Sequence, residues 1–275
     1  MKVKKIFITF IALIVILSSF VGCSNTKTDS TIEKTTIKLG VTGAEHEVWD
    51  YVKQKLAHEN IELEIVAFSD YVRPNLALAE GEIDANAFQT IAYFDKFKSD
   101  HKLDLVSIGN TVLAPMGIYS NKIETIDEVK NGDKVALPND ATNGGRALIL
   151  LQSAGLIKLK DGVGLLPTIK DVVKNPKNLE LIELVATQIP RSLDDASIAV
   201  INNGVAVEAG LTPTQDSIFI EDVSSENAKP YINIIAVKPE DKDNKALIKL
   251  ADIYHQEETK EVINRVYKGN VIPAF

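Results

Sequence analysis

The sequence predicts an α/β protein built as a two-lobed clamp, each lobe a mostly parallel sheet flanked by helices. Strand and helix patterns alternate from Thr36 onward, and such repeated units form parallel sheets with right-handed crossovers. Their number suits two lobes of ordinary domain size. Two long extended segments, near residues 108–121 and 231–237, are natural crossings between lobes. The second crossing returns the C-terminal helices to the first lobe.

The first residues have the pattern of a secretory signal that is not part of this fold. Lys2, Lys4 and Lys5 precede an uncharged apolar run from Ile6 to Val21, and Cys23, the only cysteine, follows at once. This arrangement resembles a bacterial lipobox, although Phe20 is less typical than Leu at its position. We expect cleavage before Cys23 and lipidation of that cysteine. The alternative is an ordinary secreted protein with a stray cysteine.

The expected organisation follows from these two observations. Residues 1–22 form the signal peptide and residues 23–35, rich in Ser, Thr and Lys, form a flexible tether. Residues 36–121 plus 232–275 form lobe 1, and residues 122–231 form lobe 2. Loss of three lysines with the signal peptide changes the net charge from −8 to −11, which argues against binding to nucleic acid.

Apolar spacing and turn residues define the elements of lobe 1. Strands are expected at Ile37–Val41, Ile61–Phe68 and Ile83–Ala85, and a long extended segment at Leu105–Tyr119 is interrupted at Pro115. Helices are expected from about Ala44, with Val48, Val52 and Leu56 buried, from Arg73 to Gly81, and at Phe88–Phe97. Two helices follow the last extended run, with Leu247, Leu250, Ala251 and Tyr254 on a face of the first and Val262, Ile263, Val266 and Tyr267 on a face of the second.

Lobe 2 is organised around the stretch from Val135 to Leu151. A short strand at Val135–Leu137 is stopped by Pro138, and a helix is expected from about Gly144 to Ala154, with Thr142 or Asn143 as N-cap and Gly155 at C′. The remaining elements are a capping box at Thr125–Glu128, a helix at Thr168–Val173, strands at Leu179–Leu184 and Ile198–Ile201, and a helix at Asn203–Ala209 closed by Gly210.

Polar and aromatic side chains follow the carboxyl ends of these strands, where ligands bind in open parallel sheets. Arg146, near the start of a helix, offers a planar guanidinium beside free backbone N–H groups, a combination that suits a carboxylate. Tyr71 and Phe88 offer aromatic faces for an apolar or thioether side chain, and asparagine amides suit an ammonium group. The sequence therefore predicts a site for a small zwitterion. Taken singly, each asparagine is equally typical of a turn, and Arg146 of a surface ion pair.

Several motifs resemble one family, the NlpA lipoproteins, which are methionine-binding lipoproteins of ABC importers. They are DYVRPN (70–75), GEIDANAFQ (81–89), GNT (109–111), VALPND (135–140), RALILLQSAGLIKLKDGVGLLPT (146–168), NPKNLE (175–180), PRSLDD (190–195) and AVIN (199–202). The resemblance covers nearly the whole mature chain. It implies a periplasmic-binding-protein clamp whose ligand residues are Tyr71, Phe88, Asn143, Arg146, Asn202 and Asn233.

The resemblance also implies partners and a location. The chain would capture L- or D-methionine outside the cell membrane, held there by its lipid, and deliver it to an ABC permease and its ATPase without a cofactor or a bound metal. Two departures concern the pocket: Thr90 stands where relatives often have His, and Gly204-Val205 replaces a segment that often contains Tyr. A methionine-containing dipeptide or another small amino acid is therefore the alternative ligand.

Other classes of function have less support in the sequence. His46, His58, His101 and His255 are scattered, without HExxH spacing, and no G-x-S-x-G elbow is present. A Ser–His–Asp arrangement on distant segments, as in a lipoprotein hydrolase, stays open. A secondary adhesion role stays open too, and the sequence sets neither ligand stereochemistry, nor affinity, nor oligomeric state.

Overall fold

The computed structural model describes residues 35–43, 46–224 and 226–275. The expected signal peptide, Cys23 and all of the expected tether except Thr35 lie outside these residues. In the part of the chain that is described, no helix has the length and apolar character needed to span a membrane.

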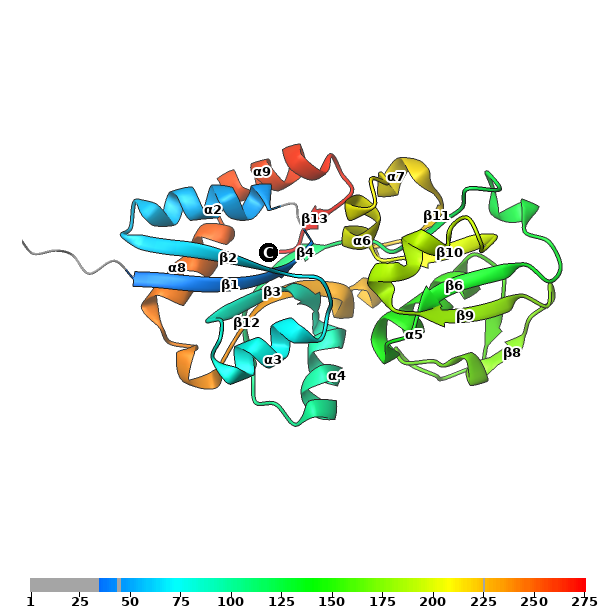
Figure 1. Cartoon of the computed structure of the whole chain (residues 1–275), viewed down its shortest axis with the longest axis horizontal. Coiled ribbons are helices and arrows are strands. Elements are labelled where there is room, and N and C mark those ends of the chain that lie inside the picture. Colours follow the sequence, from blue (N-terminus) through cyan, green and yellow to red (C-terminus); the bar gives the residue numbers. More distant parts are fainter. Residues whose placement is uncertain (1–34, 44–45, 225) are drawn as a thin grey trace, which may run out of the picture. The chain divides into compact units, whose positions relative to one another are not determined.

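A six-stranded mixed sheet contains the N-terminal strands (Figure 1). Its strands are β1 (Thr35–Thr42), β2 (Ile61–Phe68), β3 (Ala85–Thr90), β4 (Val106–Leu113), β12 (Ile232–Val237) and β13 (Ile272–Pro273). Their order is β13-β4-β12-β3-β1-β2. β1 is parallel to β2 and β3, as the repeated strand–helix units predict, whereas β12, β4 and β13 pair antiparallel. The antiparallel half is built from the extended segments that leave and return to this sheet.

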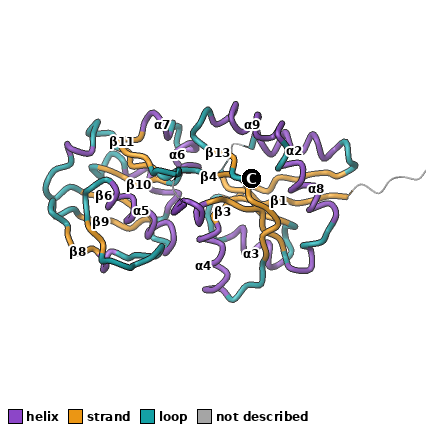
Figure 2. Tube along the Cα trace, turned by 180° about the vertical axis from the view of Figure 1, so that it is seen from behind, coloured by secondary structure: helices purple, strands orange, loops and turns teal. Residues whose placement is uncertain are grey.

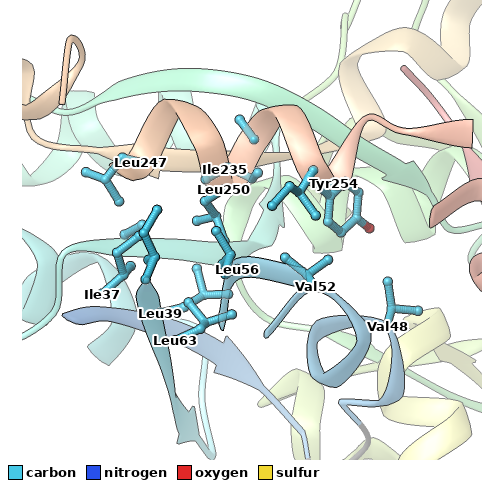
Figure 3. Close-up of a cluster of buried hydrophobic side chains, with 14 of the residues drawn as sticks. Ile37, Leu39, Val48, Val52, Leu56, Leu63, Ile235, Leu247, Leu250 and Tyr254 are labelled. Atoms are coloured by element: carbon cyan, nitrogen blue, oxygen red, sulfur yellow. The ribbon is translucent and has the colours of Figure 1, made fainter. Parts of the chain in front are cut away.

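Helices cover both faces of the first sheet. They are α2 (Glu47–Ala57), α8 (Lys245–Tyr254) and α9 (Glu257–Tyr267) on one face, and α3 (Arg73–Glu80) and α4 (Ile91–His101) on the other. Figure 3 shows Leu247 and Leu250 of α8 packing toward Ile37 and Leu39 of β1. The expected stripe of α2 is buried in the same cluster. Residues brought together from both ends of the chain therefore form one core.

A five-stranded mixed sheet contains the middle of the chain (Figure 2). Its strands are β5 (Gly117–Tyr119), β6 (Lys134–Pro138), β9 (Glu180–Leu184), β10 (Ile198–Ile201) and β11 (Ser217–Ile220). Their order is β11-β5-β10-β6-β9, with β6 parallel to both neighbours and β5 antiparallel to both of its own. Helix α5 (Ala141–Ser153) packs with one buried cluster, and the 3₁₀ helix η3 (Ala186–Ser192) and α6 (Asn203–Glu208) pack with another.

Short elements complete the fold. They are the 3₁₀ helices η1 (Ile126–Glu128), η2 (Ile169–Asp171), η4 (Glu226–Tyr231) and η5 (Pro239–Asp241), the helix α7 (Pro213–Asp216), and the antiparallel pair β7 (Lys158–Leu159) and β8 (Val172–Lys174). The chain leaves the first sheet after β4 and enters the second at β5, so residues 114–116 make the first crossing. It returns between β11 and β12, through residues 221–231.

The boundary between one expected strand and the helix after it is wrong. The helix predicted at Phe88–Phe97 begins only at Ile91, and the strand predicted at Ile83–Ala85 is instead β3, Ala85–Thr90. The polar sequence ANAFQT becomes a strand because it pairs with β1 on one side and with β12 on the other. Thr90 ends it by capping α4: its Oγ1 accepts a hydrogen bond from the backbone N–H of Tyr93 at 3.2 Å.

The N-cap predicted for the helix of the organising stretch is also wrong. α5 begins at Ala141, and Asp140 is its N-cap, with Oδ1 accepting from the Asn143 backbone N–H at 2.9 Å. The predicted end is confirmed, since Gly155 lies at C′ with a φ of 75°. The helix predicted at Thr168–Val173 is only the single turn η2, because residues 172–174 pair with β7 instead.

Candidate ligand-binding site

A cavity of about 190 Å³ lies between elements of the two sheets. Tyr71, Phe88 and Asn233 line it from the first sheet and its connections. Asn143, Arg146 and Asn202 line it from α5 and the start of α6. All of the residues expected to bind ligand are thus brought to one place. An apolar cavity of about 150 Å³ holds benzene, so this cavity suits a ligand of about the size of one amino acid.

Three aromatic rings form one wall of the cavity. The centroids of Tyr71 and Phe88 lie 6.0 Å apart, and Tyr93 meets both edge-on at 6.1 Å. The Tyr93 hydroxyl donates to the Tyr71 carbonyl at 2.9 Å, which holds the two segments together. Burial, helped by the negative charge of Asp140, raises the pKa of both tyrosines above the ordinary value. The wall is therefore neutral and mostly apolar, as an aliphatic or thioether side chain requires.

Local structure fixes this wall. The Asp70 carboxylate accepts from the backbone N–H groups of Val72 and Arg73 at 2.7 and 2.8 Å, a turn that starts α3 and presents Tyr71. Behind it, the amides of Asn75, Asn86 and Gln89 form a closed buried network, with N–O distances of 2.7–2.9 Å. Because each amide fixes the orientation of the next, β3 and its Phe88 are held rigidly against α3.

Arg146 is buried beside the cavity and is held by both crossings. Its Nε donates to Glu221 Oε1 at 2.9 Å, and its Nη2 donates to the other Glu221 oxygen and to the Ala114 carbonyl. The guanidinium lies 4.2 Å from the centre of the Tyr231 ring. Ala114 belongs to the first crossing, and Glu221 and Tyr231 belong to the second. Arg146 therefore joins the cavity to the connections between the sheets.

This geometry corrects one expectation about Arg146. From the sequence we expect the planar guanidinium to be open to a ligand carboxylate, but its Nε/Nη2 edge is occupied by Glu221. Among the described residues, none accepts a hydrogen bond from the remaining guanidinium nitrogen, Nη1. Glu221 itself was not predicted. Nothing near it in sequence marks it, although a buried arginine generally requires a counter-charge.

Asp140, Asn143 and Asn202 form a chain whose direction is set by charge. An ionised carboxylate only accepts hydrogen bonds, so Asn143 presents its Nδ2 to Asp140, at 3.0 and 3.1 Å from the two oxygens. Its Oδ1 then faces Asn202, which donates from Nδ2 at 2.8 Å. Asn202 is left with Oδ1 buried and without a hydrogen-bond partner. Asp140 thus fixes the orientation of the Asn202 amide through Asn143, and Asn202 lines the cavity.

Asn233 supplies a second amide from the opposite side. Its Nδ2 donates to the Val112 carbonyl at 3.2 Å, and its backbone pairs with Thr90 across β12 and β3. Its Oδ1 receives no hydrogen bond from any residue that the structure describes. The cavity is therefore lined by one cationic side chain, Arg146, and by two asparagines, Asn202 and Asn233, whose amide oxygens accept no hydrogen bond from the described residues.

Several lining residues were not among the predicted ligand residues. They are Thr42, Gln89, Thr90, Tyr93, Val112, Ala114, Asn203, Gly204, Tyr267 and Val271. Thr90 and Gly204 were singled out in the sequence only as departures from relatives. A Cβ atom added at Gly204 would meet no atom within 4 Å, so there is open space beside the cavity wall at that point. Over the residues described, no group of three or more His, Cys, Asp or Glu side chains is placed to hold a metal ion.

Comparisons with known proteins agree with this architecture. The family model of the NlpA lipoproteins matches residues 37–275. The chain is 48% identical to the D-methionine-binding lipoprotein MetQ of Escherichia coli K12, over 98% of each chain. A nutrient-binding protein from Burkholderia cenocepacia, solved bound to methionine, is 42% identical with a TM-score of 0.82, over 87% of this chain and 100% of that one.

A third relative is similar in sequence and structure. The substrate-binding protein of a methionine transporter from Streptococcus pneumoniae is 37% identical with a TM-score of 0.82, covering 87% of this chain and 96% of that one. Apart from the first two residues of β1, the matched region includes all strands of both sheets. This chain therefore belongs to the NlpA lipoprotein family, and its fold is that of the two-lobed periplasmic substrate-binding proteins.

Proposed function

We propose that this protein captures methionine outside the membrane and delivers it to an ABC import permease coupled to an ATPase. The observation that carries the proposal is that two residues line one amino-acid-sized cavity: Arg146, whose Nη1 has no acceptor among the described residues, and Asn202, whose buried amide oxygen has no donor. A zwitterion matches both groups, because its carboxylate accepts and its ammonium donates. The relatives that bind methionine or serve methionine transporters support the choice of amino acid.

We assign the parts of the ligand from the same contacts. Arg146 Nη1 would donate to the carboxylate, and Oδ1 of Asn202 and of Asn233 would accept from the ammonium group. The thioether would lie against the rings of Tyr71 and Phe88, where a sulfur–aromatic contact adds about 0.3–1.5 kcal/mol. Asn143 would act through Asn202, whose amide it orients.

The ligand class can be determined without assuming methionine. Mass spectrometry of the small molecule that copurifies with the protein should detect methionine. A methionine-containing dipeptide is the second candidate, since there is open space beside the cavity wall at Gly204. Detection of a different amino acid would reject the assignment. If no amino acid copurifies, failure of the protein to bind added methionine would also reject it.

We further propose that the protein acts as a binding protein and not as an enzyme, anchored on the outer face of the cell membrane by a lipid on Cys23. The relatives named as lipoproteins support the anchor. Replacement Cys23→Ala should leave an uncut precursor or release the protein from membranes. If this variant is processed and fractionates with membranes like the parent, the anchor lies elsewhere.

The division into lobes is likewise a proposal. In place of the expected first boundary after residue 121, we place the boundaries in the crossings, residues 114–116 and 221–231. This assigns β5 to lobe 2, because β5 pairs with β10 and β11.

The only tryptophan, Trp49, lines a second cavity that shares Thr42, Val112, Asn233 and Tyr267 with the ligand cavity. Its fluorescence should therefore change on ligand binding, which gives a direct titration signal.

A further inference from the structure

The short segment between α9 and β13 makes a buried polar contact with the other side of the ligand cavity. This segment, residues 268–271, follows a helix of the first-sheet region and leads into β13, which pairs with β4. Figures 1 and 2 show it beside α6, in the region of the second sheet. It is thus a non-covalent connection between the two regions, in addition to the two crossings of the chain.

Asn270 is the centre of this contact. Its Oδ1 accepts from both the backbone N–H and the hydroxyl of Thr214 in α7, at 2.9 and 2.6 Å. Its backbone carbonyl accepts from Asn203 Nδ2 at 2.8 Å. The same Nδ2 lies 3.3 Å from the Pro115 carbonyl, in the first crossing. Asn203 and Asn270 are only 4% and 8% exposed, so water competes little for these hydrogen bonds.

The contact adjoins the ligand site on both sides. Asn203 is the first residue of α6 and directly follows Asn202, whose unpartnered Oδ1 is the proposed acceptor for the ligand. Val271, next to Asn270, lines the ligand cavity, as does Asn203. The side chain of Asn202 is oriented by Asn143, whereas its backbone is positioned by the start of α6.

We infer that Asn270, with Asn203, forms a polar joint that positions the start of α6, and with it Asn202, for the ligand. This inference rests on the proposed function for its effect on methionine. Asn270 is a positioning residue, because its side chain acts through Thr214 and the segment 268–271. Its loss should loosen α6 and speed ligand release, with a smaller effect on the rate of association.

The test compares Asn270→Ala with Asn270→Asp and with a matched control. The aspartate variant keeps an acceptor for both Thr214 donors. The control, Asn175→Ala, removes side-chain bonds to the backbone of Leu179, away from the ligand cavity. We expect Asn270→Ala to weaken methionine binding about tenfold, the scale of a lost buried hydrogen bond, mostly through faster dissociation. Asn270→Asp and Asn175→Ala should bind methionine like the parent.

Hydrogen exchange on ligand-free protein supplies a measurement that does not depend on the ligand. The amides of residues 206–209 should exchange faster in Asn270→Ala than in the parent or in Asn175→Ala. If Asn270→Ala fails to fold, Thr214→Val, which removes only the hydroxyl bond, should show a smaller effect in the same direction. The inference would be overturned if amide exchange in α6 is unchanged in Asn270→Ala. It would also be overturned if Asn270→Asp binds methionine as weakly as Asn270→Ala. A parent that binds no methionine would reject the proposed function instead, while the exchange result still decides the joint.

Discussion

Arg146 and Glu221, 75 residues apart in sequence, form a buried ion pair in which the carboxylate occupies one edge of the guanidinium. The side chains are 5% and 14% exposed. Glu221 also accepts from the Met116 backbone N–H at 3.1 Å, so the pair is tied to both crossings. The guanidinium is therefore held in place without a ligand, and its Nη1 has no acceptor among the described residues.

The first prediction concerns this pair. Glu221→Gln keeps an acceptor for Met116 but leaves the Arg146 charge without a counter-ion. We expect the ligand-free protein to lose on the order of 3 kcal/mol of unfolding free energy. Because the ligand carboxylate then supplies the missing negative charge, saturating methionine should raise the melting temperature more in this variant than in the parent.

A double variant provides the control. Adding Arg146→Met to Glu221→Gln removes both charges, so the double variant should be more stable than the sum of the single effects implies. Denaturant unfolding of the parent, both single variants and the double variant measures this coupling. Additive losses would show that Arg146 and Glu221 do not stabilise one another.

The second prediction separates the two roles of Asp140. Asp140→Ser keeps a side-chain oxygen that can cap α5, so its stability should lie within about 1 kcal/mol of the parent. A serine hydroxyl lacks the two acceptor oxygens that orient the Asn143 amide. Methionine affinity should therefore fall, by about three- to tenfold for a disordered hydrogen bond in the site. If Asp140→Ser binds methionine as tightly as the parent, with folding checked by circular dichroism, the carboxylate does not orient the amides.

The third prediction concerns alkaline pH. Burial raises the pKa of Tyr71, Tyr93, Tyr119 and Tyr254 above the ordinary value of about 10. The unfolded chain then loses these protons at lower pH than the folded protein. The stability they confer is fully present below about pH 10 and falls as the pH rises beyond it. Tyrosinate absorbance from these residues should therefore appear together with the loss of circular dichroism. Ionisation of all tyrosines near pH 10 in protein that stays folded would contradict their burial.

The fourth prediction concerns the aromatic wall. Phe88→Ala removes apolar contact from the proposed thioether site without leaving a charge unpaired. We expect it to weaken methionine binding by about 1–3 kcal/mol, less than the loss of the Arg146 contact. If the wall selects the side chain of the ligand, the Phe88→Ala variant should bind leucine and methionine with similar affinity. Unchanged methionine affinity would show that Phe88 does not touch the ligand.

Local signals in the sequence predicted much of this fold. β2 and α3 have the expected bounds, because alternating apolar residues, Pro74 and Gly81 mark them without help from distant residues. Most of β3 was missed because its polar sequence becomes a strand through pairing with β1 and with β12, and β12 lies near the other end of the chain. The start of α5 was predicted at about Gly144, but the helix begins at Ala141. Several residues near Asp140 suit an N-cap, so the sequence does not single out the right one.

In the site, too, some residues are marked by local sequence signals and others depend on contacts with distant residues. The expected ligand residues meet in one cavity, and strand ends and family motifs were enough to find them. The partners that position them were not predictable: Glu221 and Asn270 lie far away in sequence, and nothing local distinguishes them from surface residues. Their roles appear only once both crossings and the segment after α9 are placed.

Isothermal titration of methionine into protein stripped of bound ligand tests the central claim most directly. The parent should bind one methionine, and Arg146→Met combined with Glu221→Gln should bind it on the order of 30-fold or more weakly, a loss of about 2–5 kcal/mol. The double variant is chosen because it leaves no unpaired buried charge, so a weaker isotherm reports the ligand contact and not unfolding. A parent that binds no methionine, or a folded double variant that binds it as tightly as the parent, would contradict the account.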